Sequence, residues 1–296
     1  MNTETTISAP VINQSEEKEK WTKIIEPKTR LLDLRLNDLW QYRDLVMMFI
    51  RRDFVSNFKQ TILGPLWFFI QPLLTTITYV VIFGRVAKLS TDGIPMLLFY
   101  LSGITIWNYF SETLTPTSGV FRENANLFGK VYFPRLTMPI SIVISNLLRF
   151  AIQFVLFLII WVYYLVATDS IQPNFYLLLT PILVLIMGLL ALGFGMMISA
   201  LTTKYKDLTF LITFSIQLLM FATPVIYPMS TVPENYRKIL AVNPISAVIE
   251  SFRFGFLGSG TFSWGALLYS FTFSLAVLFI GVVVFNRVEK KFTDII

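Results

Sequence analysis

The chain of 296 residues contains neither cysteine nor histidine. The first absence excludes disulfide bonds, thiolate metal sites and cysteine nucleophiles, and the second removes imidazole acid–base chemistry and the commonest metal ligand. A phosphate-binding G-x-x-x-x-G-K-[ST] loop is also missing, because the nearest string, NANLFGKV, has Asn124 in place of the first glycine and Val131 in place of the hydroxyl residue. We therefore expect a protein that is not an enzyme, with no catalytic centre, no metal site and no cofactor of its own.

Charge is scarce as well, since only 14% of the residues are charged and 55% are apolar. A soluble protein of this size needs more charge to cover its core. The apolar residues fall into runs long enough to cross the roughly 30 Å hydrocarbon layer of a membrane as helices. The polar opening, MNTETTISAP, lacks the apolar core of a secretory signal peptide. These features predict an all-α polytopic membrane protein.

Six runs predict six transmembrane helices. They cover about residues 62–84, 94–116, 138–166, 176–200, 209–228 and 264–286. If residue 1 is cytoplasmic, 18 of the 24 Lys and Arg residues lie in cytoplasmic segments and 5 in external ones, with Arg149 inside a span. By the positive-inside rule both termini are then cytoplasmic. We divide the chain into a flexible cytoplasmic lead (1–29), an interface region (30–60), a transmembrane domain (61–291) and a cytoplasmic tail (292–296).

An amphipathic helix is predicted just before the first span. At 100° per residue, one arc of about 120° holds the apolar side chains, with Arg43 as an exception. Its apolar members are Leu36, Leu39, Trp40, Val46, Met47, Ile50 and Phe54. The pattern favours a helix lying in the cytoplasmic membrane interface. An ordinary amphipathic helix packed on the bundle is the alternative.

The segment between the fifth and sixth runs, residues 229–263, is too apolar for a simple loop. Pro233 and Pro244 each suit the first turn of a helix, which predicts two short helices at about 233–241 and 244–257. Neither can cross the bilayer alone. We interpret the pair as an external re-entrant hairpin, which implies a polar route there. Two surface helices on the external leaflet are the alternative.

Few side chains inside the spans could act on a cargo. Arg149 lies at depth if the third helix begins near Pro139, and only reaches the interface if that helix begins near Phe150. Glu112 lies toward the cytoplasmic end of the second span. Aromatic side chains near span ends fit a membrane belt, and a subset could instead line a glycan path. The candidates for that path are Trp67, Phe68, Tyr79, Phe221 and Tyr227.

Six strings taken together resemble one family. They are RRDFVSNFKQTILGPLWFFIQPLLTTITYVVIFGRV (51–86), YLSGITIWNYFSETL (100–114), ENANLFGKVYFPR (123–135), TKYKDL (203–208), ATPVIYP (222–228) and NPISAVIESFR (243–253). In this order, on the predicted spans, they resemble the ABC-2 type transporter permeases that export O-antigen, capsule and teichoic acid. Asn57 and Lys206 depart from the residues that are common in these permeases, and Asn57 weakens a lipid-diphosphate site at that position.

The resemblance implies an assembly with partners. Two copies of the chain would form the membrane half of the exporter, and two copies of a cytoplasmic ATPase would hold ATP and Mg. The segment between the second and third spans would be a coupling helix resting in a groove of the ATPase; a plain connecting turn is the alternative. Its residues here are Glu123, Asn124, Ala125, Asn126, Leu127, Phe128 and Gly129. This segment is short, amphipathic and joined to two spans, and it offers Leu127 and Phe128 as anchors.

The resemblance also gives roles to the two ends of the path. The interface helix, with Leu36, Leu39, Trp40, Arg43 and Met47, would be a gate helix, and Arg51, Arg52 and Lys59 could meet lipid phosphates, although bilayer head groups are the simpler partner. The hairpin, with Tyr236, Pro244, Phe252 and Arg253, would be an external gate.

The resemblance therefore implies the permease subunit of an ATP-driven exporter of polyprenyl-linked polysaccharide, located in the cytoplasmic (inner) membrane, with O-antigen as first choice. It would contact membrane lipids and no nucleic acid. Exporters of teichoic acid, capsule, a small lipid or a drug share the architecture. A membrane glycosyltransferase or phosphotransferase would need clustered acidic groups on cytoplasmic loops, for which Asp207 alone is a poor candidate.

Overall fold

The computed structural model describes residues 40–56, 59, 61–131, 133–205 and 207–292, the last four by their backbone alone. The predicted flexible lead, the gate-helix residues Leu36 and Leu39, and the departures Asn57 and Lys206 lie outside this part of the chain. The described helices belong to one compact unit, Leu34–Ile296.

Every regular element in the described ranges is helical, which confirms the predicted class. In chain order the elements are α2 (Arg43–Ser56), η1 (Gly64–Leu66), α3 (Trp67–Tyr79), η2 (Val80–Val86), α4 (Met96–Ser118), α5 (Val120–Glu123), α6 (Ala125–Phe128), α7 (Thr137–Ala167), η3 (Phe175–Leu179), α8 (Thr180–Thr202), α9 (Leu208–Phe221), η4 (Met229–Thr231), α10 (Glu234–Val242), α11 (Pro244–Leu257) and α12 (Trp264–Phe292).

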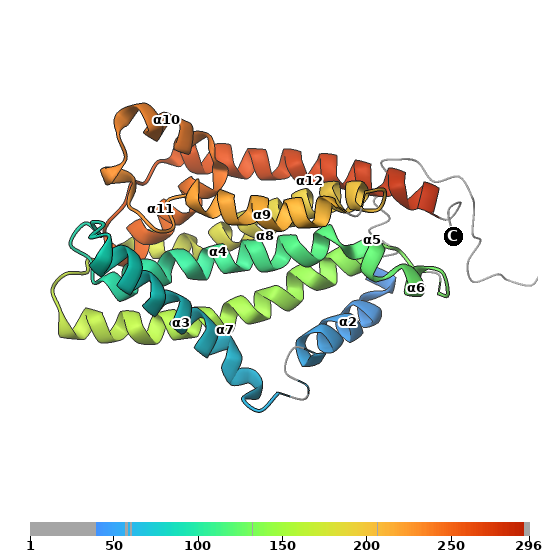
Figure 1. Cartoon of the computed structure of the whole chain (residues 1–296), viewed down its shortest axis with the longest axis horizontal. Helices are drawn as coiled ribbons and strands as arrows, with labels where there is room; N and C mark the ends of the chain where they lie inside the picture. The colour runs from blue at the N-terminus through green and yellow to red at the C-terminus, as the bar shows by residue number, and fades with distance from the viewer. Residues whose placement is uncertain (1–39, 57–58, 60, 132, 206, 293–296) are drawn as a thin grey trace, which may run out of the picture. The chain divides into compact units, whose positions relative to one another are not determined.

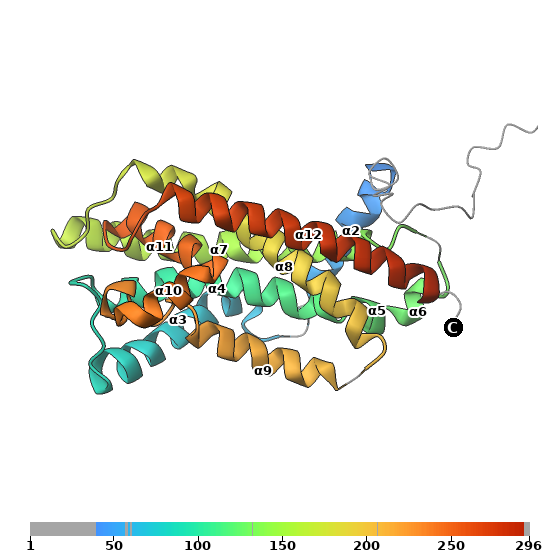
Figure 2. The same cartoon turned by 90° about the horizontal axis from the view of Figure 1, so that it is seen from above.

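Helix α4 is the centre of the unit and packs against α3, α7, α8 and α11. Most of its side chains are buried, among them Tyr100, Trp107 and Phe110. Figures 1 and 2 show α4, α7, α8 and α12 running along the same direction, with α5 and α6 at one end and α10 and α11 at the other. We call these ends the coupling-segment end and the hairpin end.

Four helical stretches are long and apolar enough to cross a membrane, and they match four of the six predicted spans. They are Gly64–Val86, Thr137–Ala167, Phe175–Thr202 and Trp264–Val288, and the bent pair α10–α11 adds a fifth if it is taken as one span. Helix α4 is also long, with 23 residues. It carries many polar side chains because protein and not lipid surrounds most of it. The chain is thus a polytopic helical membrane protein, and the count of six spans stays a prediction.

Helix α9 is shorter than the predicted span at 209–228, because it ends at Phe221. Its 14 residues reach about 21 Å, less than the roughly 30 Å hydrocarbon thickness. Pro224 and Pro228 follow and cannot continue a helix. The turned backbone is held by Asn243, whose amide donates to the carbonyl oxygen of Ala222 (3.2 Å) and to the hydroxyl oxygen of Thr223 (2.8 Å).

The two short helices predicted between the last spans are confirmed as α10 and α11. They meet at a bend of 103°. Pro244 occupies the first turn of α11, and the Asn243 side chain caps that helix by accepting from the Ile245 amide (3.0 Å). Both features follow directly from the string NPI in the sequence.

Helices α8 and α12 approach closely at two glycines. A Cβ on Gly193 would lie 2.7 Å from the Leu278 backbone nitrogen, and a Cβ on Gly281 would lie 2.5 Å from the Gly193 carbonyl oxygen. Small residues allow such approach between helices in membranes, where close packing stabilises the bundle.

Candidate functional site

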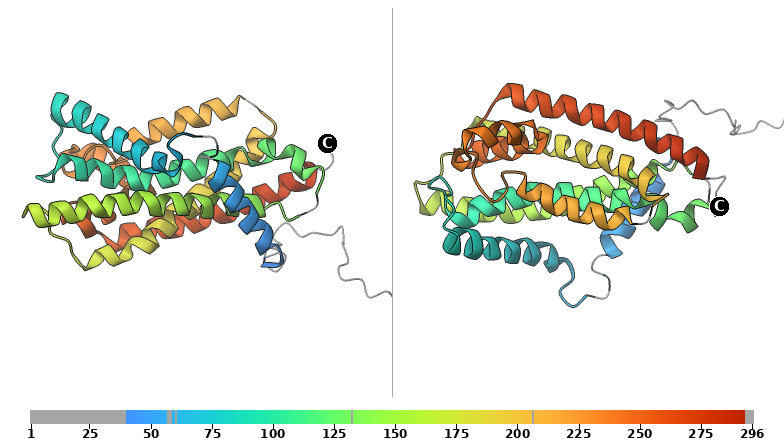
Figure 3. Two further views of the ribbon diagram at one scale, coloured as in Figure 1. Left: turned by 90° about the horizontal axis from the view of Figure 1, so that it is seen from below. Right: turned by 45° about the horizontal axis from the view of Figure 1, so that its top comes forward.

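Five buried phenylalanines meet at the coupling-segment end, and we call them the aromatic cluster. They are Phe49 on α2, Phe121 on α5, Phe128 on α6, Phe133 before α7 and Phe285 on α12. Ring centroids lie 5.8 Å apart for Phe49 and Phe133, 5.6 Å for Phe128 and Phe133, and 4.4 Å for Phe121 and Phe285. Figure 3 shows α2 near the same end of the unit as α5 and α6. The cluster therefore joins α2, the predicted coupling segment and α12.

The predicted coupling segment, residues 123–129, is not one helix. It comprises the end of α5 and all of α6, separated at Asn124. Glu123 and Asn126 are exposed and Leu127 is half-buried, whereas Phe128 is only 8% exposed. The sequence suggested Phe128 as an anchor for a partner, but its ring packs inside the chain, where Phe133 and Phe121 contact it.

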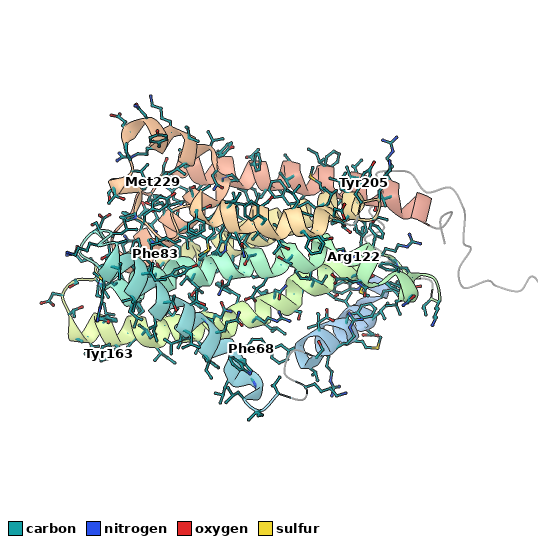
Figure 4. The ribbon with its side chains drawn as sticks, in the orientation of Figure 1. Phe68, Phe83, Arg122, Tyr163, Tyr205 and Met229 are labelled. Carbon is teal, nitrogen blue, oxygen red and sulfur yellow. The ribbon has the colours of Figure 1, made fainter. Side chains whose placement is uncertain are left out.

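The segment is also tied to α9. Arg122, which precedes it on α5, donates from Nη1 to the Thr209 hydroxyl oxygen (2.7 Å). Figure 4 shows Arg122 and Tyr205 at the same end of the unit. At the ends of α8 and α4, the Thr202 hydroxyl donates to the Ser118 carbonyl oxygen (2.7 Å). A displacement of this segment would therefore reach several helices at once.

The apolar residues predicted to share one face of α2 are only partly buried in the structure. Val46, Phe49 and Ile50 are buried, and the helix packs on α7. Trp40 and Met47 are 71% and 64% exposed. One side of the helix therefore faces protein and another presents apolar side chains outward, as a membrane-interface helix does. Phe49 lies outside the predicted arc, and sequence reasoning missed it for that reason.

The three cations suggested for lipid phosphates differ in their contacts. Arg51 and Lys59 are exposed. Arg52 is paired with Asp53, with Nη2 at 2.7 Å from Oδ1, and its guanidinium lies 4.8 Å from the centroid of the Phe49 ring. Arg51 and Lys59 are therefore more available to a phosphate than Arg52.

A polar seam runs between α4 and α7. It consists of Asn108 and Glu112 on α4 and Asn146, Arg149 and Gln153 on α7. Asn146 donates to the Glu112 carbonyl oxygen (2.8 Å), and Asn108 donates to the Gln153 side-chain oxygen (3.4 Å). Because α7 begins at Thr137, Arg149 lies twelve residues inside the helix, about 18 Å from its start. The alternative of a helix beginning near Phe150 is therefore wrong.

The suggested glycan-path aromatics form two groups. Tyr79, Phe221 and Tyr227 lie around the end of α9, where the Tyr79 hydroxyl is 3.5 Å from the Met220 sulfur and the Tyr227 hydroxyl donates to the Phe221 carbonyl oxygen (2.9 Å). Trp67 and Phe68 lie at the start of α3, as Figure 4 shows for Phe68. Phe221 is 55% exposed and Trp67 44%. Both groups thus present an aromatic surface outward.

At the hairpin end Arg253 is the central residue, and it is only 1% exposed. From α11 it donates to the carbonyl oxygens of Pro224 and Val225 (2.6 Å for Val225), and its guanidinium lies 3.9 Å from the centroid of the Phe99 ring on α4. Gly103 leaves room for it, because a Cβ there would lie 2.7 Å from Nη2. Arg253 therefore fixes the hairpin to α4 and to the turn after α9.

The other predicted hairpin residues lie in different environments. Glu250 approaches Arg253 at 3.8 Å and accepts from the Thr261 amide (3.0 Å). Pro244 and Phe252 are buried, while Tyr236 on α10 is 63% exposed. Of the four residues suggested as an external gate, only Tyr236 is presented at the surface.

These features define a class: a polytopic helical membrane protein with a short turned segment at one end and a bent helix pair at the other. Residues 44–257 match the family model described as ABC-2 type transporter. Since this match covers well over half of the chain, the chain belongs to the ABC-2 type transporter family, as a membrane transport subunit without a catalytic domain.

Curated relatives align over most of their length. The O-antigen export system permease protein RfbA of Myxococcus xanthus is 28% identical over 220 residues, covering 74% of this chain and 82% of the relative. A protein of the same description from Klebsiella pneumoniae is 27% identical over 256 residues, 86% of this chain and 95% of the relative. The polysialic acid transport protein KpsM of Escherichia coli is 25% identical over 246 residues, 81% of this chain and 91% of the relative.

Proposed function

We propose that this chain is the permease of an ATP-driven exporter that moves a polyprenyl-linked polysaccharide, an O-antigen in the first instance, outward across the cytoplasmic membrane. The observation that carries the proposal is the alignment with O-antigen permeases over up to 95% of a relative's length. The family match supports a separate ATPase partner that holds ATP and Mg. Two copies of each chain complete the assembly.

The topology in this proposal has six spans with both termini cytoplasmic. The coupling-segment end is then cytoplasmic and the hairpin end external. The distribution of Lys and Arg supports this orientation. The central position of α4 supports counting it as a span, because a helix shielded by protein tolerates polar side chains at membrane depth.

In the proposed mechanism the ATPase binds the exposed side of the coupling segment, including Glu123 and Asn126. Nucleotide binding displaces the segment, and the aromatic cluster carries the displacement to α2. Close-packed interiors transmit such shifts because they deform little. The gate at the lipid side and the path for the glycan then open together.

The second copy in this proposal covers α9. This helix is apolar, and Ile216 is its one buried side chain among the described residues. Phe210, Phe214 and Leu218 are each more than half exposed. A glycan passing between two copies would then meet Tyr79, Phe221 and Tyr227.

Deletion of the gene for this chain tests the proposal. Lipid-linked glycan should accumulate on the cytoplasmic face, measured by extracting carrier lipids and by protection of the glycan from an external glycosidase. The sugar composition of that material separates O-antigen from capsule. Normal surface glycan with no accumulation would reject the proposal.

A further inference from the structure

The second part of the apolar stretch Gly64–Val86 is not an α-helix. Its last seven residues, the element η2 (Val80–Val86), form a π-helix that continues α3 without a break. The Ala87 amide at its end donates to the Ile82 carbonyl oxygen (2.8 Å), which is five residues back instead of the four of an α-helix. A π turn therefore holds one more residue than an α turn. Such turns are rare, and those inside helices are frequently found at functional sites.

Few buried side chains hold α3 and η2 in place. The buried residues of these two elements are Pro72, Thr76 and Gly84, and all the others are at least partly exposed. At Gly84 the packing on α4 is close, because a Cβ there would lie 2.6 Å from the Met96 sulfur. The chain is therefore fixed at Gly84, whereas the residues between Pro72 and Gly84 can turn with little loss of buried contact.

The helix between Pro72 and η2 also has a second set of hydrogen-bond donors. The hydroxyls of Thr75, Thr76 and Thr78 donate to the carbonyl oxygens four residues back, at 3.0, 2.7 and 2.9 Å. Backbone carbonyls at membrane depth must stay hydrogen-bonded, and threonine hydroxyls can take over where a backbone amide leaves. These carbonyl oxygens would stay paired if their amides moved to the fifth residue back. The three threonines therefore lower the cost of moving a π turn along α3.

A buried hydroxyl beside η2 lacks a partner. The Tyr100 side chain on α4 is fully buried, and its hydroxyl makes no hydrogen bond within the described part of the chain. Its ring centroid lies 6.3 Å from that of Tyr79, whose ring is also 5.4 Å from Phe83 of η2. An unsatisfied buried hydroxyl raises the free energy of the arrangement that contains it. The free-energy gap to a second arrangement of the same helix is smaller for that reason.

We propose that η2 is a register switch, in which the π turn moves from Val80–Val86 toward Pro72. Each residue that the turn passes shifts by one position in the helix, which rotates its side chain by about 100° around the helix axis. Pro72 bounds the movement, because proline has no amide that could change its hydrogen-bond partner. Gly84 and the loop that follows it stay in place.

Tyr79 is the first residue that the moving turn passes, since it is the last residue of α3. Its hydroxyl lies 3.5 Å from the Met220 sulfur at the end of α9, and the rotation removes this contact. The consequence for transport rests on the proposed function. Rotation of Tyr79 changes the width of the proposed glycan path beside Phe221 and Tyr227, although neither end of the first span has to move.

The absence of cysteine allows the switch to be followed with one nitroxide label per chain. Ile77→Cys places the label before η2 and Val86→Cys places it at the end of η2, where the native side chains are 45% and 75% exposed. The full chain, co-expressed with its ATPase partner in phosphatidylcholine nanodiscs, is measured without nucleotide and with ATP and vanadate. The oxygen accessibility of the Ile77 label should fall several-fold with nucleotide, because the side chain turns from lipid toward protein, while that of the Val86 label stays the same. Any other pattern would overturn the switch: a change at both positions marks movement of the whole helix, and no change at Ile77 marks a fixed register.

Deletion of Val81 is the second test. The deletion removes the extra residue of the π turn, so it should convert η2 to an α-helix and keep both flanks in register. The variant should fold and hydrolyse ATP, with export reduced about tenfold and with the Ile77 label no longer responding to nucleotide. Deletion of Leu74 in α3 is the control, because Leu74 is also exposed but its loss rotates one flank against the other by about 100° and should lower the melting temperature. Normal export by the Val81 deletion, or an equal loss of stability in the two deletions, would contradict the switch.

The switch and the proposed function fail separately. The label measurement follows the helix and requires no cargo, and it carries the test if the Val81 deletion does not fold. Accumulation of glycan in the strain that lacks this chain, together with normal export by the Val81 deletion, would reject only the switch. No accumulation in that strain would reject the proposed function.

Discussion

The ring centroid of Phe49 on α2 lies 5.8 Å from that of Phe133, which precedes α7. Phe133 in turn lies 5.6 Å from Phe128 on α6. Helix α2 and the predicted coupling segment therefore share one core, although Phe49 and Phe128 lie 79 positions apart in the sequence. Motion of either element must repack these rings or move the other element with it.

Replacing Phe133 by leucine tests this linkage. The change keeps an apolar side chain and should cost only about 1 kcal/mol of stability. It removes ring contacts to both neighbours, so we expect the ATPase to co-purify and hydrolyse ATP while export falls several-fold. Phe279→Leu is the control, because Phe279 on α12 is 60% exposed. Equal export by both variants would contradict the linkage.

Substitution by aspartate should have different effects at Leu127 and at Phe128. Leu127→Asp places a charge at a half-buried position next to the exposed Asn126, where the ATPase is proposed to bind, and should reduce co-purification of the ATPase while the permease stays folded. Phe128→Asp buries an unpaired carboxylate and should prevent folding. Size-exclusion profiles and pull-down yields measure the difference. Ile239→Asp, at an exposed position on α10, should leave the ATPase bound; a loss there as great as in Leu127→Asp would speak against docking on the coupling segment.

We expect Arg253 to be required for the stability of the folded permease, whether or not it also acts in gating. Arg253→Gln removes hydrogen bonds to the turn after α9 and leaves Glu250 without its cation, which should cost about 3–5 kcal/mol. The double variant with Glu250→Gln should recover part of this loss, because no unpaired charge then remains. Thermal unfolding in detergent measures both. A double variant that is less stable than Arg253→Gln would refute the ion-pair explanation.

Two glycines of α12, Gly281 and Gly265, differ in the space around them, and alanine substitutions at the two positions can be compared directly. Gly281→Ala forces a Cβ against the Gly193 carbonyl oxygen and should lower stability by about 1–3 kcal/mol. Gly265→Ala lies on the same helix, where a Cβ would meet only the Ser263 hydroxyl oxygen at 3.7 Å, and should be neutral. Equal melting temperatures for the two variants would show that the helices can separate without cost.

Local patterns were sufficient to predict several elements. Long apolar runs predicted four spans to within about two residues, and Pro233 and Pro244 predicted the two short hairpin helices, because helix starts depend on neighbours in the chain. The end of α9 was predicted less well. The predicted span continued to residue 228, whereas α9 ends at Phe221, where Pro224 and the side chain of Asn243 turn the backbone.

The sequence by itself determined the class of protein, a polytopic helical membrane protein. A helix surrounded by lipid needs a long apolar run, and such a run can be recognised without knowing which helices it packs against. The sequence alone also shows the resemblance to ABC-2 permeases, which the family match bears out. The tertiary structure decided which side chains meet: Phe49 with Phe133, Arg253 with Pro224 and Val225, and Arg149 with Phe68. Such contacts join helices distant in the chain, and a helical period shows which residues share a face but not which helix that face will meet.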